Sequence, residues 1–447
     1  MIDEKIKTLL DIKYNYTPKA FVRTFGCQQN VSDGELIKGQ LQNIGYEIVT
    51  ELDDADFVIF NTCAVRETAE DRVMGNIGNL VHHKQKKKDC IIAVCGCMTQ
   101  QEKVANSIKQ KFPHVSLVFG TNAIHKLPEM VYSLLNGQKR LFITGEPDED
   151  IHENMPAVRD HKTRGWLPIM YGCDNYCTYC IVPYVRGRER SRKSVDVINE
   201  AKELIKSGIK EITLLGQNVN SYKSDITFPE LLSKVNSLDG EFIIRFMTSH
   251  PKDCTNELLQ IMSQCEKVPK HLHLPFQSGN NEILDKMNRK YTREEYLALI
   301  SKARELMPDI TFSSDVIVGF PGENHEQFCD TLSLIKQVKF NALFTFIFSK
   351  RSGTPAADMF DPVSGEDKSK WFRELLKTQE KLSEVTLSKF KNKTVRVLCE
   401  EYKDGIIWGK SDNNINTEFI GDETLIGQFV NVRITEPKTY ILKGEKV

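Results

Sequence analysis

The 447-residue sequence lacks any apolar run long enough to cross a membrane, because no stretch approaches about 18 consecutive apolar residues. Its start, Met1-Ile2-Asp3-Glu4-Lys5, lacks the basic flank and apolar core of a secretory leader. These two absences exclude a membrane-spanning class, indicate no membrane partner and predict a cytoplasmic protein.

The sequence also lacks a net charge of either sign. Its 60 Lys and Arg residues are balanced by 61 Asp and Glu residues, which gives a formal charge of -1. A chain of this kind has no global positive field to attract nucleic acid. Any nucleic-acid partner must therefore be held by local basic patches.

Disulfide bonds are not expected, although the chain contains 12 cysteines. In a reducing compartment, cysteines serve as metal ligands or core residues more readily than as disulfide partners. Their spacing therefore becomes the main guide to function.

Three cysteines, Cys173, Cys177 and Cys180, follow the apolar stretch 166–171 with spacings of three and two intervening residues. Such spacing lets three sulfurs converge on one iron-sulfur cube and leaves one of the four irons free for a small molecule. A zinc site is an alternative, but it needs a fourth ligand, and no second cysteine pair lies nearby. Three unliganded core thiols are the other alternative, which the polar loop disfavours.

The amino-terminal part repeats a βα pattern three times, with strands expected at 20–25, 57–60 and 91–94. A cysteine follows each strand, namely Cys27, Cys63 and Cys97. Ligands gather beyond the carboxyl ends of parallel strands, so a second three-cysteine site is possible there. Separate core thiols remain the alternative, as expected for Cys90 and Cys95.

Two further local patterns carry predictions. Ser32-Asp33-Gly34-Glu35 matches a capping box and predicts the start of a helix. Arg186, Arg188, Arg190 and Arg192 alternate, so an extended chain would present all four on one face suited to phosphate or carboxylate. A surface strand with an incidental basic edge is the alternative.

The central part again alternates strands and helices. Six strands are expected, at 166–171, 211–215, 242–247, 271–274, 310–317 and 341–348. Repeated βα units predict a complete or partial parallel barrel with its active site at the carboxyl ends of the strands. Small hydrogen-bonding residues follow or end three of these strands, at 215–218, 248–251 and 315–323, where they suit close approach to a nucleoside.

The carboxyl-terminal part begins with an expected long helix over 368–393, which carries eight Lys or Arg residues against three Glu. Five short alternating stretches follow, at 394–398, 405–409, 416–420, 428–434 and 439–442. They predict a small five-stranded β-barrel. Such a barrel binds RNA in some proteins and only stabilises its neighbour in others, and its near-neutral charge does not decide between these.

The three-cysteine loop resembles that of the radical S-adenosylmethionine (SAM) enzymes. The stretches TFGCQQN, FNTCAVRETAE and CGCMTQ resemble the amino-terminal domain of the methylthiotransferases, and the last part is similar to the TRAM domain. The resemblance implies an α/β fold in three domains. These are an open parallel α/β domain at 18–140, a partial (βα)6 radical SAM barrel at 159–388 and a small TRAM β-barrel at 389–447.

The resemblance implies two 4Fe-4S clusters, with SAM bound at one of them. Cys173, Cys177 and Cys180 would hold the SAM-binding cluster, and Cys27, Cys63 and Cys97 would hold the other. Cys97 is preferred to Cys95 because it follows Gly96, as in the family pattern. The SAM contacts it implies are Tyr179, Gln217, Asn218, Ser249, Asp315 and Ile317.

The implied reaction is methylthiolation of C2 of N6-isopentenyladenosine at position 37 of tRNA, with two SAM and a sulfur donor. No catalytic acid or base is expected, since an inert aromatic C–H requires cofactor chemistry. The implied partners are tRNA and an electron donor such as a flavodoxin or ferredoxin. The protein is expected to be a monomer.

Three alternatives remain for the function. Two are methylthiotransferases, one acting on threonylcarbamoyladenosine in tRNA and one on a ribosomal protein. The third is a zinc-containing RNA-binding protein that is not an enzyme. The stretches NTCAVRETAE and GCQQN favour the isopentenyl type.

Overall fold

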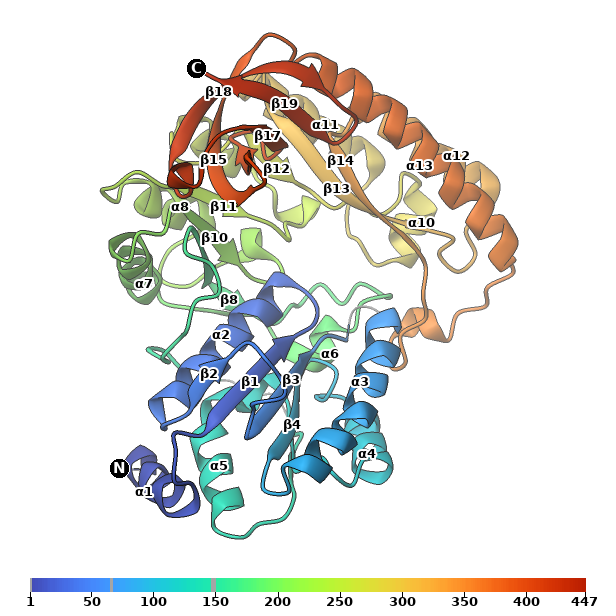
Figure 1. Ribbon diagram of the computed structural model, residues 1–447. Helices are drawn as coiled ribbons and strands as arrows, with labels where there is room; N and C mark the ends of the chain where they lie inside the picture. The colour runs from blue at the N-terminus through green and yellow to red at the C-terminus, as the bar shows by residue number, and fades with distance from the viewer. Residues whose placement is uncertain (1, 65–66, 146–149) are drawn as a thin grey trace. The chain divides into compact units, whose positions relative to one another are not determined.

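The structure is a computed structural model that describes residues 2–64, 67–145 and 150–447 (Figure 1). The chain forms two compact units. The first comprises Met1–Asp160, Tyr171–Asp174 and Ile181–Arg190; the second comprises His161–Met170, Asn175–Cys180 and Ser191–Val447.

The first unit contains a parallel sheet of six strands in the order β2-β1-β3-β4-β5-β6. Their bounds are Lys19–Thr24 (β1), Glu47–Val49 (β2), Phe57–Thr62 (β3), Ile91–Gly96 (β4), Leu117–Phe119 (β5) and Leu141–Ile143 (β6). The open parallel sheet expected from three βα units is therefore confirmed. The strands β2, β5 and β6 extend it beyond those units.

Helices cover both faces of this sheet (Figure 1). On one face, Phe57 and Ile59 pack in a core with residues of α1 (Ile2–Lys13), α2 (Gln28–Asn43) and α5 (Leu127–Leu135). On the other, Val58 and Phe60 pack with α3 (Glu67–Lys86) and α4 (Glu102–Lys111). Burial of both faces explains why β3 and β4 are continuously apolar at their starts.

The predicted capping box was wrong. Helix α2 begins at Gln28 with Cys27 as its N-cap, so Ser32-Asp33-Gly34-Glu35 lies inside the helix. The carboxylates of Asp33 and Glu35 bind residues distant in sequence: Asp33 pairs with Arg186 and Glu35 with Arg159. These two carboxylates therefore pair with distant arginines and do not cap the start of a helix.

The second unit contains all six predicted central strands. β7 (Arg164–Pro168), β10 (Glu211–Leu215) and β11 (Ile243–Phe246) form one three-stranded parallel sheet, and β12 (His271–His273), β13 (Thr311–Val318) and β14 (Ala342–Ile347) form another. The helices that alternate with them are α7 (Ser194–Lys206), α8 (Phe228–Asn236), α9 (Asn256–Gln264), α10 (Asn281–Lys286), α11 (Arg293–Leu306) and α12 (His325–Val338). The partial (βα)6 barrel is therefore confirmed.

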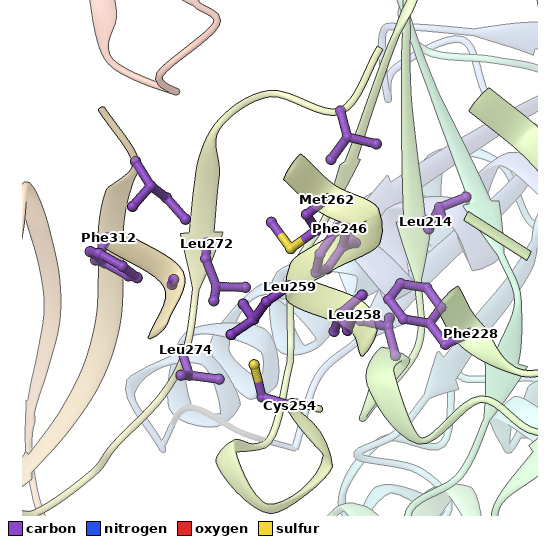
Figure 2. Packing of buried hydrophobic residues seen from close by; sticks show 14 of the residues in the cluster. Leu214, Phe228, Phe246, Cys254, Leu258, Leu259, Met262, Leu272, Leu274 and Phe312 are labelled. Atoms are coloured by element: carbon purple, nitrogen blue, oxygen red, sulfur yellow. The ribbon is translucent and has the colours of Figure 1, made fainter. Parts of the chain in front are cut away.

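One hydrophobic core joins the two sheets of this barrel. Leu214 and Phe246 from one sheet and Leu272 and Phe312 from the other belong to the same buried cluster. Side chains of α9 lie among them, as Figure 2 shows for Leu258, Leu259 and Met262. Helix α9 thus packs against strands of both sheets.

Three of these helices begin with a capping box. Thr227 with Glu230, Thr292 with Glu295 and Asn324 with Gln327 form complete capping boxes at the starts of α8, α11 and α12. Each N-cap contributes about 1 kcal/mol. The segments between the strands and these helices lie at the carboxyl ends of the barrel strands.

The chain ends in a long helix and a closed barrel, as predicted, but the helix ends before Lys389, Lys391 and Lys393 of the expected span 368–393. Helix α13 spans Gly365–Ser388, and the barrel order is β15-β16-β17-β19-β18. Its strands are β15 (Thr394–Lys403), β16 (Ile406–Ser411), β17 (Asn416–Ile420), β18 (Phe429–Pro437) and β19 (Ile441–Lys446).

The terminal barrel packs against the starts of the central strands through buried charges. Arg245 of β11 donates to Glu211 of β10 at 2.7 Å and to the carbonyl of Ser411 in β16 at 3.1 Å. Burial acts to raise the pKa of Glu211, but the charge of Arg245 outweighs it, so that pKa lies below its usual range. The terminal barrel is therefore bound tightly to the amino end of the central barrel.

We expect Arg245→Met to destabilise the second unit by about 3–5 kcal/mol, because it leaves the buried Glu211 carboxylate unpaired. Adding Glu211→Gln should recover most of this loss. Urea unfolding followed by tryptophan fluorescence measures it, since Trp166, Trp371 and Trp408 all lie in the second unit.

The control is Arg433→Met, which breaks the exposed Arg433–Glu445 pair (3.0 Å) and should cost about 0–1 kcal/mol. Equal losses in the two single variants would contradict the role given to the buried pair.

Candidate metal centres and cofactor site

Cys27, Cys63 and Cys97 lie at the carboxyl ends of β1, β3 and β4, which are neighbours in the first sheet. Gly26 and Cys63 approach so closely that a Cβ on Gly26 would lie 2.3 Å from the Cβ of Cys63. Gly26 also has a φ of +127°, so this approach requires glycine. The fold thus brings together three cysteines that are far apart in sequence.

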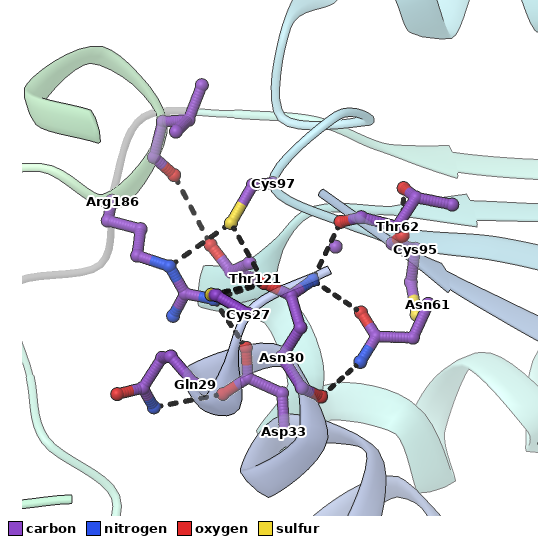
Figure 3. Close-up of polar contacts among 12 residues, drawn as sticks. Cys27, Gln29, Asn30, Asp33, Asn61, Thr62, Cys95, Cys97, Thr121 and Arg186 are labelled. Atoms are coloured by element: carbon purple, nitrogen blue, oxygen red, sulfur yellow. Dashed lines mark hydrogen bonds and ion pairs between the residues drawn. The ribbon is translucent and has the colours of Figure 1, made fainter. Parts of the chain in front are cut away.

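Asn30 of α2 lies beside the thiols of Cys27 and Cys97 (Figure 3). Its side-chain oxygen accepts from the Cys27 thiol at 3.4 Å and from the Cys97 thiol at 3.7 Å. Its amide nitrogen donates to the carbonyl of Thr62 at 2.8 Å, which fixes its orientation. A hydrogen bond with Cys63 lowers the pKa of Cys27 to about 6, which favours the thiolate that binds metal.

Cys95 and Cys97 have different environments. Cys95 is fully buried in β4 among apolar side chains, and burial raises its pKa well above the usual value. Burial also raises the pKa of Cys97, to about 11, but the Cys97 sulfur accepts a hydrogen bond from Arg186 Nε at 3.1 Å. Of the two, only Cys97 lies with Asn30 and Arg186.

The four alternating arginines do not form one basic face. Arg186 ends the short helix α6 (Val182–Arg186) and is buried against Asp33, at 2.6 Å. Gly187 has a φ of 75°, which turns the chain there, and the Arg188 side chain is 72% exposed. The prediction of a single extended face was wrong because the first arginine is helical and paired in the interior.

The second cysteine triad is divided between the units. Cys173 belongs to the first, where its N–H donates to Gly187 O at 3.1 Å; Cys177 and Cys180 belong to the second. The Cys177 sulfur lies 3.5 Å from a guanidinium nitrogen of the buried Arg289, which also donates to Pro275 O at 2.6 Å. Sequence reasoning missed Arg289, and a buried arginine has no local signal in a single sequence.

Four polar atoms at the carboxyl ends of β10 and β11 are buried without a hydrogen-bond partner in the described chain. They are Gln217 Oε1, Asn218 Oδ1, Ser249 Oγ and His250 Nε2. Such an atom costs about 1–3 kcal/mol unless a ligand satisfies it. A polar ligand at this end of the barrel would supply the missing partners.

His250 was not singled out from the sequence. Burial lowers its pKa to about 2, so its ring is neutral. Its Nδ1 accepts from the Lys252 N–H at 3.2 Å, which places the ring proton on Nε2. Nε2–H is therefore a buried donor available to an acceptor atom of a ligand.

The other predicted cofactor residues lie on different parts of the second unit. Tyr179 and Ile317 belong to one apolar cluster with the buried Phe320. Asp315 lies two residues before Ile317 on β13 and is 3.7 Å from His273 Nε2. Asp315 and Ile317 pair in register with the partly exposed Phe344 and Phe346 of β14, so these side chains share one face.

Across residues 2–64, 67–145 and 150–447, no three His, Cys, Asp or Glu side chains surround one point as ligands of a single metal ion would. A cube differs, because each of its protein ligands binds a separate iron. In the same residues, no helix is long and apolar enough to cross a membrane.

Three family models match the chain: the Radical SAM superfamily at residues 167–335, Uncharacterized protein family UPF0004 at 19–120 and the TRAM domain at 388–447. A relative from Acetivibrio thermocellus, named tRNA-2-methylthio-N(6)-dimethylallyladenosine synthase, is 48% identical over 95% of this chain and 90% of its own. One of the same name from Clostridium tetani is 45% identical over 100% of both chains. The chain belongs to the tRNA-2-methylthio-N(6)-dimethylallyladenosine synthase family.

Membership of this synthase family confirms the resemblance seen in the sequence. Among solved structures, the radical SAM methyltransferase TsrM from Kitasatospora setae superposes with a TM-score of 0.58 at 14% identity, over 76% of this chain and 77% of that chain. The cobalamin-dependent radical enzyme OxsB superposes with a TM-score of 0.53 over 83% of this chain and 57% of its own. At these identities the likeness concerns the fold alone.

In metal-free protein, we expect Cys27 to be alkylated before Cys95 and Cys97, because Cys27 is exposed while the other two are buried. A pKa of about 6 keeps Cys27 mainly as thiolate at pH 7, and its rate should fall about tenfold between pH 7 and pH 5 as the thiolate is protonated. Iodoacetamide labelling followed by peptide mass spectrometry measures this, with the exposed Cys329 as the reference thiol. Earlier labelling of Cys95 or Cys97 would contradict it.

Proposed function

We propose that this chain is a radical SAM tRNA methylthiotransferase that converts N6-dimethylallyladenosine at position 37 of tRNA to its 2-methylthio form. The observation that carries this proposal is 45–48% identity, over nearly the whole chain, to relatives named for that activity. The radical SAM and TRAM matches agree with it.

Cys27, Cys63 and Cys97 hold the sulfur-inserting 4Fe-4S cluster in this proposal, and Cys173, Cys177 and Cys180 hold the SAM-binding one. The contacts of Cys27 and Cys97 with Asn30, and of Cys63 with Cys27, support the first assignment, and the low pKa of Cys27 suits a thiolate ligand. The spacing of the second three in one loop supports the other. When bound, the clusters and SAM supply the radical chemistry that an unreactive aromatic C–H requires.

SAM is proposed to bind at the carboxyl ends of the barrel strands. Gln217, Asn218 and Ser249 each place an unpartnered buried polar atom there, which a nucleoside or amino-acid group would satisfy. We add His250 as a neutral donor. Tyr179 and Ile317 would contribute apolar contacts, and Asp315 a hydrogen-bond acceptor.

The proposed tRNA-binding surface is the exposed side of α13 together with the terminal barrel. Arg373, Lys377 and Lys381 of α13 are exposed, while Trp371 and Leu375 are buried on its other side. Lys368 is not available, because it is buried and paired with Asp361. Lys and Arg side chains displace condensed counterions when they contact phosphates. Helix α13 carries as many acidic as basic residues, so the proposed RNA contact is a local one made by exposed basic side chains such as Lys377 and Lys381.

The proposal includes three domains, with boundaries near 140–159 and 388. It also includes a flavodoxin or ferredoxin as reductant, a monomeric state and a cytoplasmic location. In the structure, residues 191–447 belong to one compact unit.

The proposed function predicts that the protein accepts only one of two modified tRNAs as its substrate. Cluster-loaded protein supplied with SAM, reductant and a sulfur source should methylthiolate tRNA that carries N6-dimethylallyladenosine, but not tRNA that carries threonylcarbamoyladenosine. Mass spectrometry of the nucleosides distinguishes the products. Activity on the second tRNA alone would overturn the substrate assignment.

The two proposed ligand sets predict that replacing each triad removes iron but abolishes a different part of the activity. With Cys173, Cys177 and Cys180 changed together to Ala, the chain should keep about half of its eight irons and cleave no SAM. With Cys27, Cys63 and Cys97 changed to Ala, it should still cleave SAM but form no methylthio product. Iron analysis and chromatography of the SAM products measure both; unchanged iron in either variant would refute that ligand set.

The RNA surface predicts a change in the salt dependence of tRNA binding. Lys377→Glu with Lys381→Glu should weaken binding and flatten the slope of log affinity against log salt by about 1 unit for each phosphate that is no longer neutralised. The matched control is Lys202→Glu with Lys206→Glu, an exposed pair with the same spacing on α7. Filter binding over a salt series should show the parent slope in the control, and equal slopes in both variants would exclude α13 from the surface.

A further inference from the structure

Arg186 is a buried cation with two different anchors. Its side chain is 6% exposed; Nη2 lies 2.6 Å from Asp33 Oδ2, and Nε lies 3.1 Å from the Cys97 sulfur. Figure 3 shows the guanidinium between the carboxylate and the thiol, with Asn30 beside both. A charge this deep is retained only when its partners compensate for the hydration that burial removes.

The two anchors have separate roles. Asp33 neutralises the guanidinium and is itself held by Gln29, whose amide donates to it at 3.3 Å. The guanidinium is planar and rigid, so its contact with Asp33 also fixes the direction of Nε–H. That N–H is directed at the sulfur of Cys97, which is a ligand in the proposed amino-terminal cluster.

We propose that Arg186 is a positioning residue of the amino-terminal cluster, whose hydrogen bond to the Cys97 sulfur and positive charge favour the reduced form of that cluster. The inference rests on the proposed ligand set Cys27, Cys63 and Cys97. Hydrogen bonds to ligand sulfurs and nearby charge are two of the features by which a protein sets the potential of an iron-sulfur cluster. A reduced cluster carries one more negative charge, so a neighbouring cation stabilises it relative to the oxidised form.

The chain offers a matched control two residues away. Arg188 is 72% exposed and pairs with Asp174 at 3.2 Å, so Arg188→Met removes the same charge without a contact to Cys97. Arg186→Met removes both the charge and the donor, whereas Arg186→Lys keeps the charge and removes the planar group. If Arg186 only stabilised the fold, the reduction potential of the cluster would not differ among these variants according to the charge and the donor that each one removes.

The experiment uses the full-length chain with Cys173, Cys177 and Cys180 changed to Ala, so that only the amino-terminal cluster remains. Its potential is measured by redox titration followed by electron paramagnetic resonance. We expect Arg186→Met to shift the ratio of reduced to oxidised cluster at least tenfold toward oxidised, which is about 59 mV for one electron. Arg186→Lys should lie between Met and the parent, and Arg188→Met should match the parent.

Two different failures are distinguishable. A parent without iron would overturn the proposed ligand set and this inference with it. An iron-loaded parent whose potential is unchanged by Arg186→Met would overturn only the inference. If the Met variant does not retain the cluster, Arg186→Gln takes its place as a neutral residue of polar character; an unchanged potential there overturns the inference and a lowered one supports it.

Discussion

Adjacent parallel strands that end at one edge of a sheet are the constraint on which the amino-terminal site depends. Strands β1, β3 and β4 pair in order, and each continues into the segment that carries a cysteine. Their ends are packed closely: a Cβ on Gly96, whose φ is +105°, would lie 2.2 Å from the carbonyl oxygen of Thr62. Three thiols from distant parts of the chain therefore reach one place without a loop of their own.

Each cysteine triad has a buried arginine beside one of its sulfurs. Arg186 lies against Cys97 and is anchored by Asp33; Arg289 lies against Cys177 and is anchored by Pro275 O. Thiolates and cluster sulfides carry negative charge, so a low-dielectric surrounding would disfavour them without a nearby cation or donor. Arg186 and Arg289 would meet this requirement in the two proposed clusters, each with its own anchor in a separate unit.

In the second unit, a buried ion pair and a group of unpartnered buried polar atoms lie at opposite ends of the strands. At the amino ends, Arg245 and Glu211 form a satisfied buried pair that also binds the terminal barrel. At the carboxyl ends, Asn218, Ser249 and His250 keep buried polar atoms without partners in the described chain. Unsatisfied groups are costly in a folded chain, so those at the carboxyl ends of β10 and β11 are consistent with a ligand that completes them.

Local patterns in the sequence predicted the strands, the terminal barrel and the close spacing of Cys173, Cys177 and Cys180, because period-2 alternation and short spacings are properties of short segments. Cys27, Cys63 and Cys97 are far apart in the chain, and only the order of the strands brings them to one edge of the sheet. The tertiary structure alone decided which of Cys95 and Cys97 lies with Asn30, and that Ser32-Asp33-Gly34-Glu35 is helix interior. It also decided that Arg186 and Arg289 are buried while Arg188 is exposed. In each of these cases the partner comes from a distant part of the chain, and a single sequence carries no local trace of such a partner.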